Sequence, residues 1–265
     1  MALYDINGNV IQSGSTIVNA TIANAEGRII KSVSHRGATT SGGAGAGYLS
    51  QYKYAREVGF LYGENDMNFT KDGIPIMRHD GTIPVNGANK SIAAMTYEEL
   101  IAVDSKIPTL AEFLNFCKCI GMYPYLDTKR WSGTWSLDNL TIALNICAES
   151  GILRDTTWII GTIDEASHIL AFDERARIGW LAQPTEANMT SLLALKTDKN
   201  DLFFDSDYNG LTSENIQRCI DNKIPLEVYT LQSESAILSL HPYVTGVTAN
   251  GTLVASSIYY NANMT

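Results

Sequence analysis

Residues 110–161, LAEFLNFCKCIGMYPYLDTKRWSGTWSLDNLTIALNICAESGILRDTTWIIG, contain two repeats of a helix pattern followed by a short apolar run. Apolar side chains recur at helical spacing over Leu110–Ile120 and again over Leu137–Glu149. Met122–Asp127 and Thr157–Gly161 have the length and composition of buried strands. A chain that alternates strands and helices in this way is typical of a parallel sheet covered by helices.

The same alternation extends in both directions from this stretch. The other expected strands are Arg28–Ser34, Phe60–Met67, Arg177–Leu181, Leu202–Asp205, Pro225–Tyr229 and Val244–Thr248. The other expected helices are Leu49–Val58, Ile163–Phe172, Glu186–Leu195, Ser213–Asn222 and Glu234–Leu240. Eight strands separated by seven helices predict an α/β protein with a TIM (β/α)₈ barrel. A doubly wound open sheet of five to seven strands is the alternative.

Two segments depart from the alternation. In residues 1–28, two short apolar runs flank Asn7-Gly8, a pair suited to a tight hairpin turn, and a polar stretch follows. We therefore expect residues 1–28 to form a hairpin and linker leader, and residues 29–265 to form the barrel. Between Thr70 and Pro108, turn signals and a short extended run predict a hairpin-and-loop insertion after the second strand.

The overall composition limits the kinds of function. The 265 residues carry a formal net charge of −9, which argues against a nucleic-acid-binding surface or a polybasic membrane anchor. No apolar run approaches the roughly 18 residues of a membrane-spanning helix, and no signal peptide is visible at the N-terminus. Low lysine content and abundant polar residues favour an extracellular or virion-associated protein. The four cysteines follow no ligand pattern, so we expect buried thiols. The sequence indicates no oligomeric state.

Residues capable of chemistry gather at the expected strand ends, where TIM barrels place their active sites. They are His35, Arg36, Glu64, Asp66, Asp127 and Lys129. Glu64 and Asp66 have the i,i+2 spacing that puts both side chains on one face of a strand, as do Asp127 and Lys129. Converging carboxylates repel one another unless a cation lies between them, which predicts a divalent metal, Mg²⁺ or Ca²⁺. Arg36 and Lys129 would then bind an anionic group such as a phosphate.

A second histidine enters through the expected hairpin after the second strand. If Asp72-Gly73 form a two-residue loop, His79 lies directly opposite Asp66. Two imidazoles, His35 and His79, would then flank the metal, as is suited to moving two protons during phosphodiester cleavage. The simpler interpretations are that the acids form a surface ladder or that Asp127 and Lys129 only pair with each other.

At this point the sequence resembles the glycerophosphodiester phosphodiesterase family. The motifs that carry the resemblance are His35-Arg36-Gly37, Glu64-Asn65-Asp66, Thr70-Lys71-Asp72-Gly73, His79-Asp80, Pro108-Thr109-Leu110-Ala111-Glu112-Phe113-Leu114 and Asp127-Thr128-Lys129. The resemblance implies a TIM barrel that hydrolyses a glycerophosphodiester with a metal. It also implies that Glu64, Asp66 and Asp127 are metal ligands, that His35 and His79 are the acid/base pair, and that Arg36 and Lys129 bind the substrate phosphate.

Several positions depart from the family pattern. The glycine-rich stretch Ala38–Gly47 replaces a polar motif, and it lacks the GxGxxG spacing of a nucleotide loop, so a lid or entry loop is the better interpretation. Asp127 stands where the family usually has Glu. Asp205 and Asp207 also have strand-end spacing, and a substrate-facing role or a helix-leading turn explains them equally well. Two alternatives stay open. The hairpin leader resembles the connectors that precede enzymatic modules of phage tail proteins, which suggests hydrolysis of poly(glycerol phosphate), as in teichoic acid. The missing family motifs suggest a catalytically silent barrel that binds a glycan or lipid.

Overall fold

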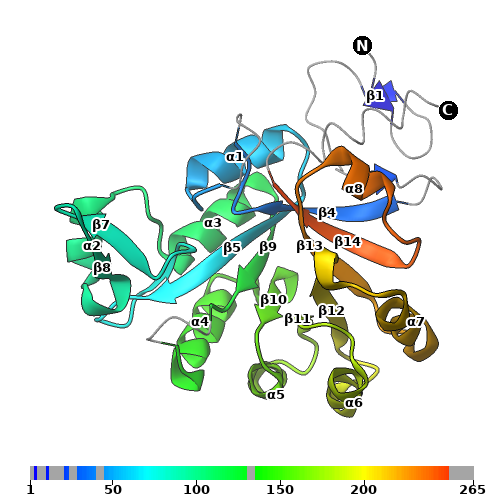
Figure 1. The fold of residues 1–265 in the computed structure, drawn as a ribbon. Helices are drawn as coiled ribbons and strands as arrows, with labels where there is room; N and C mark the ends of the chain where they lie inside the picture. Colours follow the sequence, from blue (N-terminus) through cyan, green and yellow to red (C-terminus); the bar gives the residue numbers. More distant parts are fainter. Residues whose placement is uncertain are drawn as a thin grey trace.

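Eight parallel strands close into a barrel surrounded by helices (Figure 1). The computed structural model describes residues 3–4, 10–11, 21–23, 29–39, 45–129 and 135–250. The barrel strands are β4 (Ile29–His35), β5 (Tyr62–Phe69), β9 (Tyr123–Asp127), β10 (Thr157–Ile160), β11 (Arg177–Leu181), β12 (Asp201–Asp207), β13 (Leu226–Leu231) and β14 (Val244–Ala249). Strand β14 pairs with β4 and β4 pairs with β5, so the ring is closed. The predicted TIM barrel is confirmed, and the open sheet is excluded.

Helices follow seven of the barrel strands. They are α1 (Leu49–Glu57), α3 (Leu110–Ile120), α4 (Leu137–Glu149), α5 (Ile163–Phe172), α6 (Glu186–Leu195), α7 (Ser213–Asn222) and α8 (Glu234–Leu238). Five of them have the predicted bounds, because their ends carry local signals. The side chains of Thr109 and Ser136 accept hydrogen bonds from backbone N–H groups of the first turns of α3 and α4. Gly121, with φ of 66°, ends α3 in the left-handed conformation that glycine adopts at little cost.

Two hydrophobic layers hold the barrel together. Most buried apolar side chains lie in a large cluster between the helices and the outer face of the strands. A smaller cluster fills the inside of the barrel and consists of Val33, Tyr125, Ile159 and Phe203. Gly179 makes room for this inner cluster, since a Cβ there would lie 2.5 Å from the ring of Phe203. The middle of the barrel interior is therefore a packed core.

The insertion after β5 has the predicted extent but contains more regular secondary structure than the sequence predicted. The antiparallel strand β6 (Pro75–Met77) returns along β5 and forms the expected hairpin. A second hairpin, β7 (Thr82–Val85) and β8 (Ala88–Ser91), follows, and then a short helix, α2 (Tyr97–Val103). The insertion has its own small hydrophobic core of Ile76, Ile83, Ile92, Met95, Leu100 and Ile107. Figure 1 shows it projecting beside the barrel at the end of β5.

The N-terminal segment contains the expected hairpin, in which β1 (Leu3–Tyr4) pairs with β2 (Val10–Ile11). A further strand, β3 (Thr21–Ala23), pairs antiparallel with the beginning of β4. The separation of residues 1–28 as a leader stays a prediction. No helix in the described part of the chain is long and apolar enough to cross a membrane. All four cysteines are free, and three are buried, but Cys119 is exposed, contrary to expectation, because it lies on the solvent side of α3.

Candidate active site

A cavity of about 230 Å³ opens at the carboxyl ends of the barrel strands. All seven residues predicted from the sequence line it: His35, Arg36, Glu64, Asp66, His79, Asp127 and Lys129. The remaining lining residues are Ile159, Leu181, Asp205, Tyr229, Thr230 and Thr248. The structure therefore brings together groups that lie as much as 94 positions apart in the chain, from His35 to Lys129.

Strand pairing places three carboxylates beside one another. Asp66 of β5 lies directly opposite Asp127 of β9, and Glu64 lies opposite His35 of β4. Glu64, Asp66 and Asp127 are all buried, and each offers an oxygen within 4.8 Å of the others. Asn65 points to the other side of the strand, as expected, where its side-chain amide donates a hydrogen bond to the carbonyl of Gly47.

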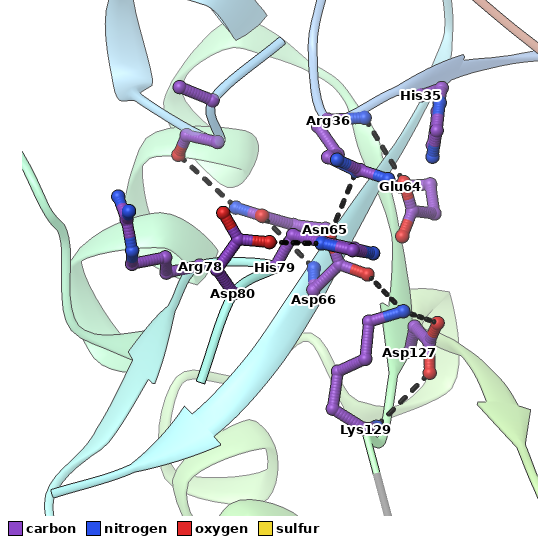
Figure 2. A network of polar contacts seen from close by, with 12 residues as sticks. His35, Arg36, Glu64, Asn65, Asp66, Arg78, His79, Asp80, Asp127 and Lys129 are labelled. Atoms are coloured by element: carbon purple, nitrogen blue, oxygen red, sulfur yellow. Dashed lines mark hydrogen bonds and ion pairs between the residues drawn. The ribbon is translucent and has the colours of Figure 1, made fainter. Parts of the chain in front are cut away.

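Two cationic side chains contact these acids (Figure 2). The Lys129 ammonium lies 2.7 Å from both Asp66 Oδ1 and Asp127 Oδ2. The Arg36 Nε lies 3.2 Å from Asp66 Oδ2, and the backbone N–H of Arg36 donates to Glu64 Oε2 at 3.0 Å. Arg36 and Lys129 have positive φ angles of 56° and 36°, which non-glycine residues rarely adopt. The simple Asp127–Lys129 pair therefore exists, but within a larger network.

The charges in this network do not balance. Burial and the nearby charges of Asp66 and Asp127 raise the pKa of Glu64 well above its usual value. Burial also raises the pKa of Asp127, although Lys129 partly offsets it. Burial alone would lower the pKa of Lys129, but the three carboxylates outweigh it and raise that pKa. Three acids face two cations, and oxygen ligands suit hard ions, so these residues fit a divalent cation such as Mg²⁺ or Ca²⁺.

His35 is held by a residue that the motifs did not reveal. Its Nδ1 lies 2.6 Å from the Oδ1 of Asn250, just after β14. A carboxamide oxygen only accepts hydrogen bonds, so Nδ1 carries the proton and Nε2 is left free to accept one. Burial, followed by the charge of Arg36, lowers the pKa of His35 to about 4. The ring is therefore a neutral base near pH 7, oriented by Asn250.

The pairing register of β5 and β6, which precede His79 in the chain, differs from the predicted one. Met67 pairs with Met77, so Asp66 lies opposite Arg78, whose N–H donates to the Asp66 carbonyl at 2.8 Å. The loop contains three residues instead of two, because Gly73 takes a positive φ of 77° at its third position. The predicted register was thus wrong by one residue. His79 still lines the cavity, because the chain leaves the strand after Met77.

The partner of His79 is its neighbour in sequence. His79 Nδ1 lies 2.8 Å from Asp80 Oδ1, and the hydrogen bond holds the pKa of Asp80 below its usual value. Asp80 therefore gives His79 an acidic hydrogen-bond partner. The side chain of His79 is 38% exposed, whereas His35 is mostly buried. The two histidines therefore have opposite electrostatic surroundings.

The other side of the cavity was largely missed by the sequence analysis. Tyr229, Thr230 and Thr248 come from β13 and β14, and these common polar residues carry no motif. Asp205 was recognised only as a strand-end acid with two equally good explanations. Asp205 lies in the cavity wall, whereas Asp207 accepts a hydrogen bond from the N–H of Asn209 in the turn that follows.

A barrel whose carboxyl end carries an acidic cluster, two cations and two imidazoles is a scaffold suited to metal-assisted chemistry on an anionic substrate. The chain belongs to the glycerophosphoryl diester phosphodiesterase family, whose family model matches residues 35–250. The match begins at His35 and ends at Asn250, the two residues that hydrogen-bond each other in the site.

Individual proteins agree with this assignment. Rat (Rattus norvegicus) glycerophosphodiester phosphodiesterase 1 is 27% identical over 115 residues, which is 38% of this chain. The match spans only about a third (34%) of the rat protein. A glycerophosphodiester phosphodiesterase from Parabacteroides distasonis superimposes with a TM-score of 0.71 at 18% identity, covering 88% of this chain and 98% of that one. An Oleispira antarctica phosphodiesterase in complex with its product sn-glycerol-3-phosphate gives 0.73 at 16% identity, covering 89% and 97%. These two likenesses establish the fold.

Proposed function

We propose that this protein hydrolyses a glycerophosphodiester to an alcohol and glycerol phosphate. The observation that carries the proposal is the meeting of an acidic triad and two differently held histidines in one cavity. Family membership and the product named for the Oleispira antarctica structure point to the same substrate class. Arg36 and Lys129 are the cations in the cavity wall that would bind the phosphate.

In the proposed reaction, His35 is the base and His79 the acid. His35 Nε2 takes the proton from the attacking oxygen, which belongs to water or to the neighbouring hydroxyl of the glycerol. As that oxygen bonds to phosphorus, the bond from phosphorus to the leaving alcohol oxygen breaks, and His79 protonates the alcohol. If the glycerol hydroxyl attacks first, a cyclic phosphate forms, and water opens it with the two histidines exchanging roles. Each proton transfer is worth about 10²–10⁴-fold in rate.

Glu64, Asp66 and Asp127 would hold a divalent cation. Bound there, such an ion supplies Lewis-acid polarisation of the phosphoryl group. The fit rests on the raised pKa of Glu64 and on the excess of acids over cations. Asp127 has a shorter side chain than the Glu that is usual in the family. The position of its carboxylate would therefore influence which divalent ion binds.

The decisive experiment measures release of glycerol phosphate from glycerophosphoglycerol after chelation and after adding back Mg²⁺ or Ca²⁺. We expect activity to disappear on chelation and to return with one ion, and Asp127→Asn to abolish the response. Asp155→Asn changes an exposed acid at the opposite end of the barrel and serves as the matched control. Turnover that ignores chelation would reject the metal-dependent mechanism.

The same assay separates the two alternative functions. Release of glycerol phosphate from purified poly(glycerol phosphate), without turnover of small diesters, would identify a teichoic-acid hydrolase. Binding without any turnover in the presence of either ion would identify a silent binding barrel.

A further inference from the structure

The cavity wall has two chemically different halves. Strands β4, β5 and β9, together with the segments that follow them, carry the histidines, the acidic triad and both cations, whereas β10 to β14 carry apolar and neutral polar residues apart from Asp205. In the closed ring, β12 is four strands away from β5 in either direction, so Asp205 lies across the barrel from the acidic triad. A substrate whose phosphate lies at the triad would extend its organic part toward Asp205.

Asp205 is a buried acid without the partners that buried acids normally have. The residue is 4% exposed, and its Oδ1 has no hydrogen-bond partner in the described part of the chain. Glu227, its neighbour across the β12–β13 pairing, is also buried but contacts Lys31 and Arg177, each at 2.6 Å. Leaving a buried polar group unpaired costs about 1–3 kcal/mol, so an unpaired one in a cavity wall indicates a ligand that pairs with it.

The surroundings of Asp205 favour a hydroxyl group as that ligand. Burial, and then the charges of Glu227 and Asp127, raise the pKa of Asp205 well above its usual value, which favours the protonated carboxyl, a group that can both donate and accept hydrogen bonds. The neighbouring wall supplies the hydroxyls of Tyr229, Thr230 and Thr248. Recognition of a quaternary ammonium uses a cage of aromatic faces, and Tyr229 is the one aromatic residue in the cavity wall described.

We infer that Asp205 is a specificity-determining residue that binds a hydroxyl of the glycerol or alcohol part of the substrate, across the cavity from the phosphate. The inference rests on the proposed function for the identity of the substrate. A hydrogen bond of this kind contributes about 10- to 100-fold in affinity.

The test compares two ligands that share a phosphate and differ in hydroxyl groups. Calorimetry with sn-glycerol 3-phosphate and with methyl phosphate, both in the presence of Mg²⁺ or Ca²⁺, measures the preference for the hydroxyls. We expect Asp205→Ala to lose about 10- to 100-fold of affinity for sn-glycerol 3-phosphate and to leave methyl phosphate within about twofold. Asp205→Asn should retain most of the preference, because an amide also donates and accepts hydrogen bonds.

Asp207→Ala is the matched control, because Asp207 lies two residues further along β12 and serves the following turn. An equal loss of both ligands in Asp205→Ala, or no loss of either, would overturn the inference. Should the alanine variant not fold, Asp205→Ser provides a shortened polar side chain for the same comparison. Because binding is measured without turnover, a protein that binds the ligands but hydrolyses nothing would refute the proposed function and leave this inference standing.

A kinetic comparison completes the test for an active enzyme. Glycerophosphoglycerol carries hydroxyl groups, whereas bis(p-nitrophenyl) phosphate carries none. We expect Asp205→Ala to lower kcat/KM about 10- to 100-fold on glycerophosphoglycerol. On bis(p-nitrophenyl) phosphate, kcat/KM should stay within about twofold of the wild-type value. A parallel fall on both substrates would mean that Asp205 acts on the barrel or the catalytic groups, and the inference would be wrong.

Discussion

Each end of the barrel interior contains a group of charged side chains. The numbers of acidic and basic side chains are equal in only one of these two groups. At the amino end of the strands, Glu227 contacts Lys31 and Arg177 and accepts a hydrogen bond from Tyr125 at 3.2 Å. Arg177 also pairs with Asp201, so two acids meet two cations. Gly246 makes room for this group, since a Cβ there would lie 2.7 Å from the Glu227 side chain.

At the carboxyl end, three acids meet two cations in an open cavity. Burial, and then the neighbouring acids, raise the pKa of Glu64, and the cavity that it lines can admit a ligand. The difference shows how one barrel separates stability from function. The charged side chains at the amino end pair with one another. At the carboxyl end, the excess of acidic side chains can bind a cation, and the cavity can admit a substrate. This division agrees with the general location of barrel active sites.

The largest expected effect comes from removing the base at the open end. His35→Ala should lower kcat about 10²–10⁴-fold, because no other described group replaces the acceptor at Nε2. The measurement is steady-state hydrolysis of glycerophosphoglycerol with the preferred metal. His241→Ala changes an exposed histidine far from the cavity wall and should behave as wild type. Comparable activity in both variants would remove His35 from the mechanism.

A substitution in the charged group at the amino end should change the stability of the protein instead of its activity. Glu227→Gln leaves the partly buried Lys31 and Arg177 without their shared acid, and leaving such groups without a partner costs about 1–3 kcal/mol. Thermal unfolding should show a Tm lowered by about 2–4 °C for each kcal/mol. Glu214→Gln breaks a surface pair with Arg218 and should cost less than about 1 kcal/mol. If both variants have the same Tm, the charged group at the amino end does not stabilise the protein in the way described.

The pH dependence should reveal the unusual surroundings of His35. Protonation of its ring removes the acceptor, so kcat/KM should fall as the pH falls through the pKa of His35. Burial and Arg36 lower that pKa to about 4, so the acidic limb should lie well below the ordinary histidine value of about 6.5. The check is a pH–rate profile from pH 3.5 to 8, with circular dichroism to confirm folding. An acidic limb near pH 6.5 would contradict the assignment.

The smallest expected effect is a gain in stability at the open end. Glu64→Gln removes one of three repelling carboxylates and keeps an acceptor for the Arg36 N–H. The metal-free variant should therefore be more stable than metal-free wild type by about 1 kcal/mol at pH 7. Adding Mg²⁺ or Ca²⁺ should raise the Tm of wild type and change the variant much less. A less stable metal-free variant would show that the acids do not repel one another.

Much of this architecture was predictable from the sequence because its signals are local. Capping residues such as Thr109, Ser136 and Thr212 mark helix starts within one turn, and five helices have the predicted bounds. The i,i+2 spacing of Glu64 and Asp66 correctly predicted that they share one face of β5. Periodicity and strand-end position need no knowledge of distant contacts.

Other features depended on contacts that no local pattern contains. The β5–β6 register differed by one residue because Gly73 completes a three-residue loop, and turn length alone decides which residues face each other. The second hairpin and α2 of the insertion are held by their own core, which only the folded chain assembles. Asn250 reaches His35 across 215 positions, and an isolated asparagine gives no sequence signal.

The sequence by itself determined the order of strands and helices, the closed barrel and the residues with catalytic chemistry, because hydrophobic periodicity and strand-end motifs are properties of neighbouring residues. Only the tertiary structure decided which charges find partners. Glu227 and Asp205 are both buried acids on adjacent strands, yet Glu227 contacts two cations, whereas Oδ1 of Asp205 has no hydrogen-bond partner among the described residues. A buried charge pairs with distant side chains that lie in the same layer of the barrel. The register of the strands around the whole ring decides which side chains share a layer.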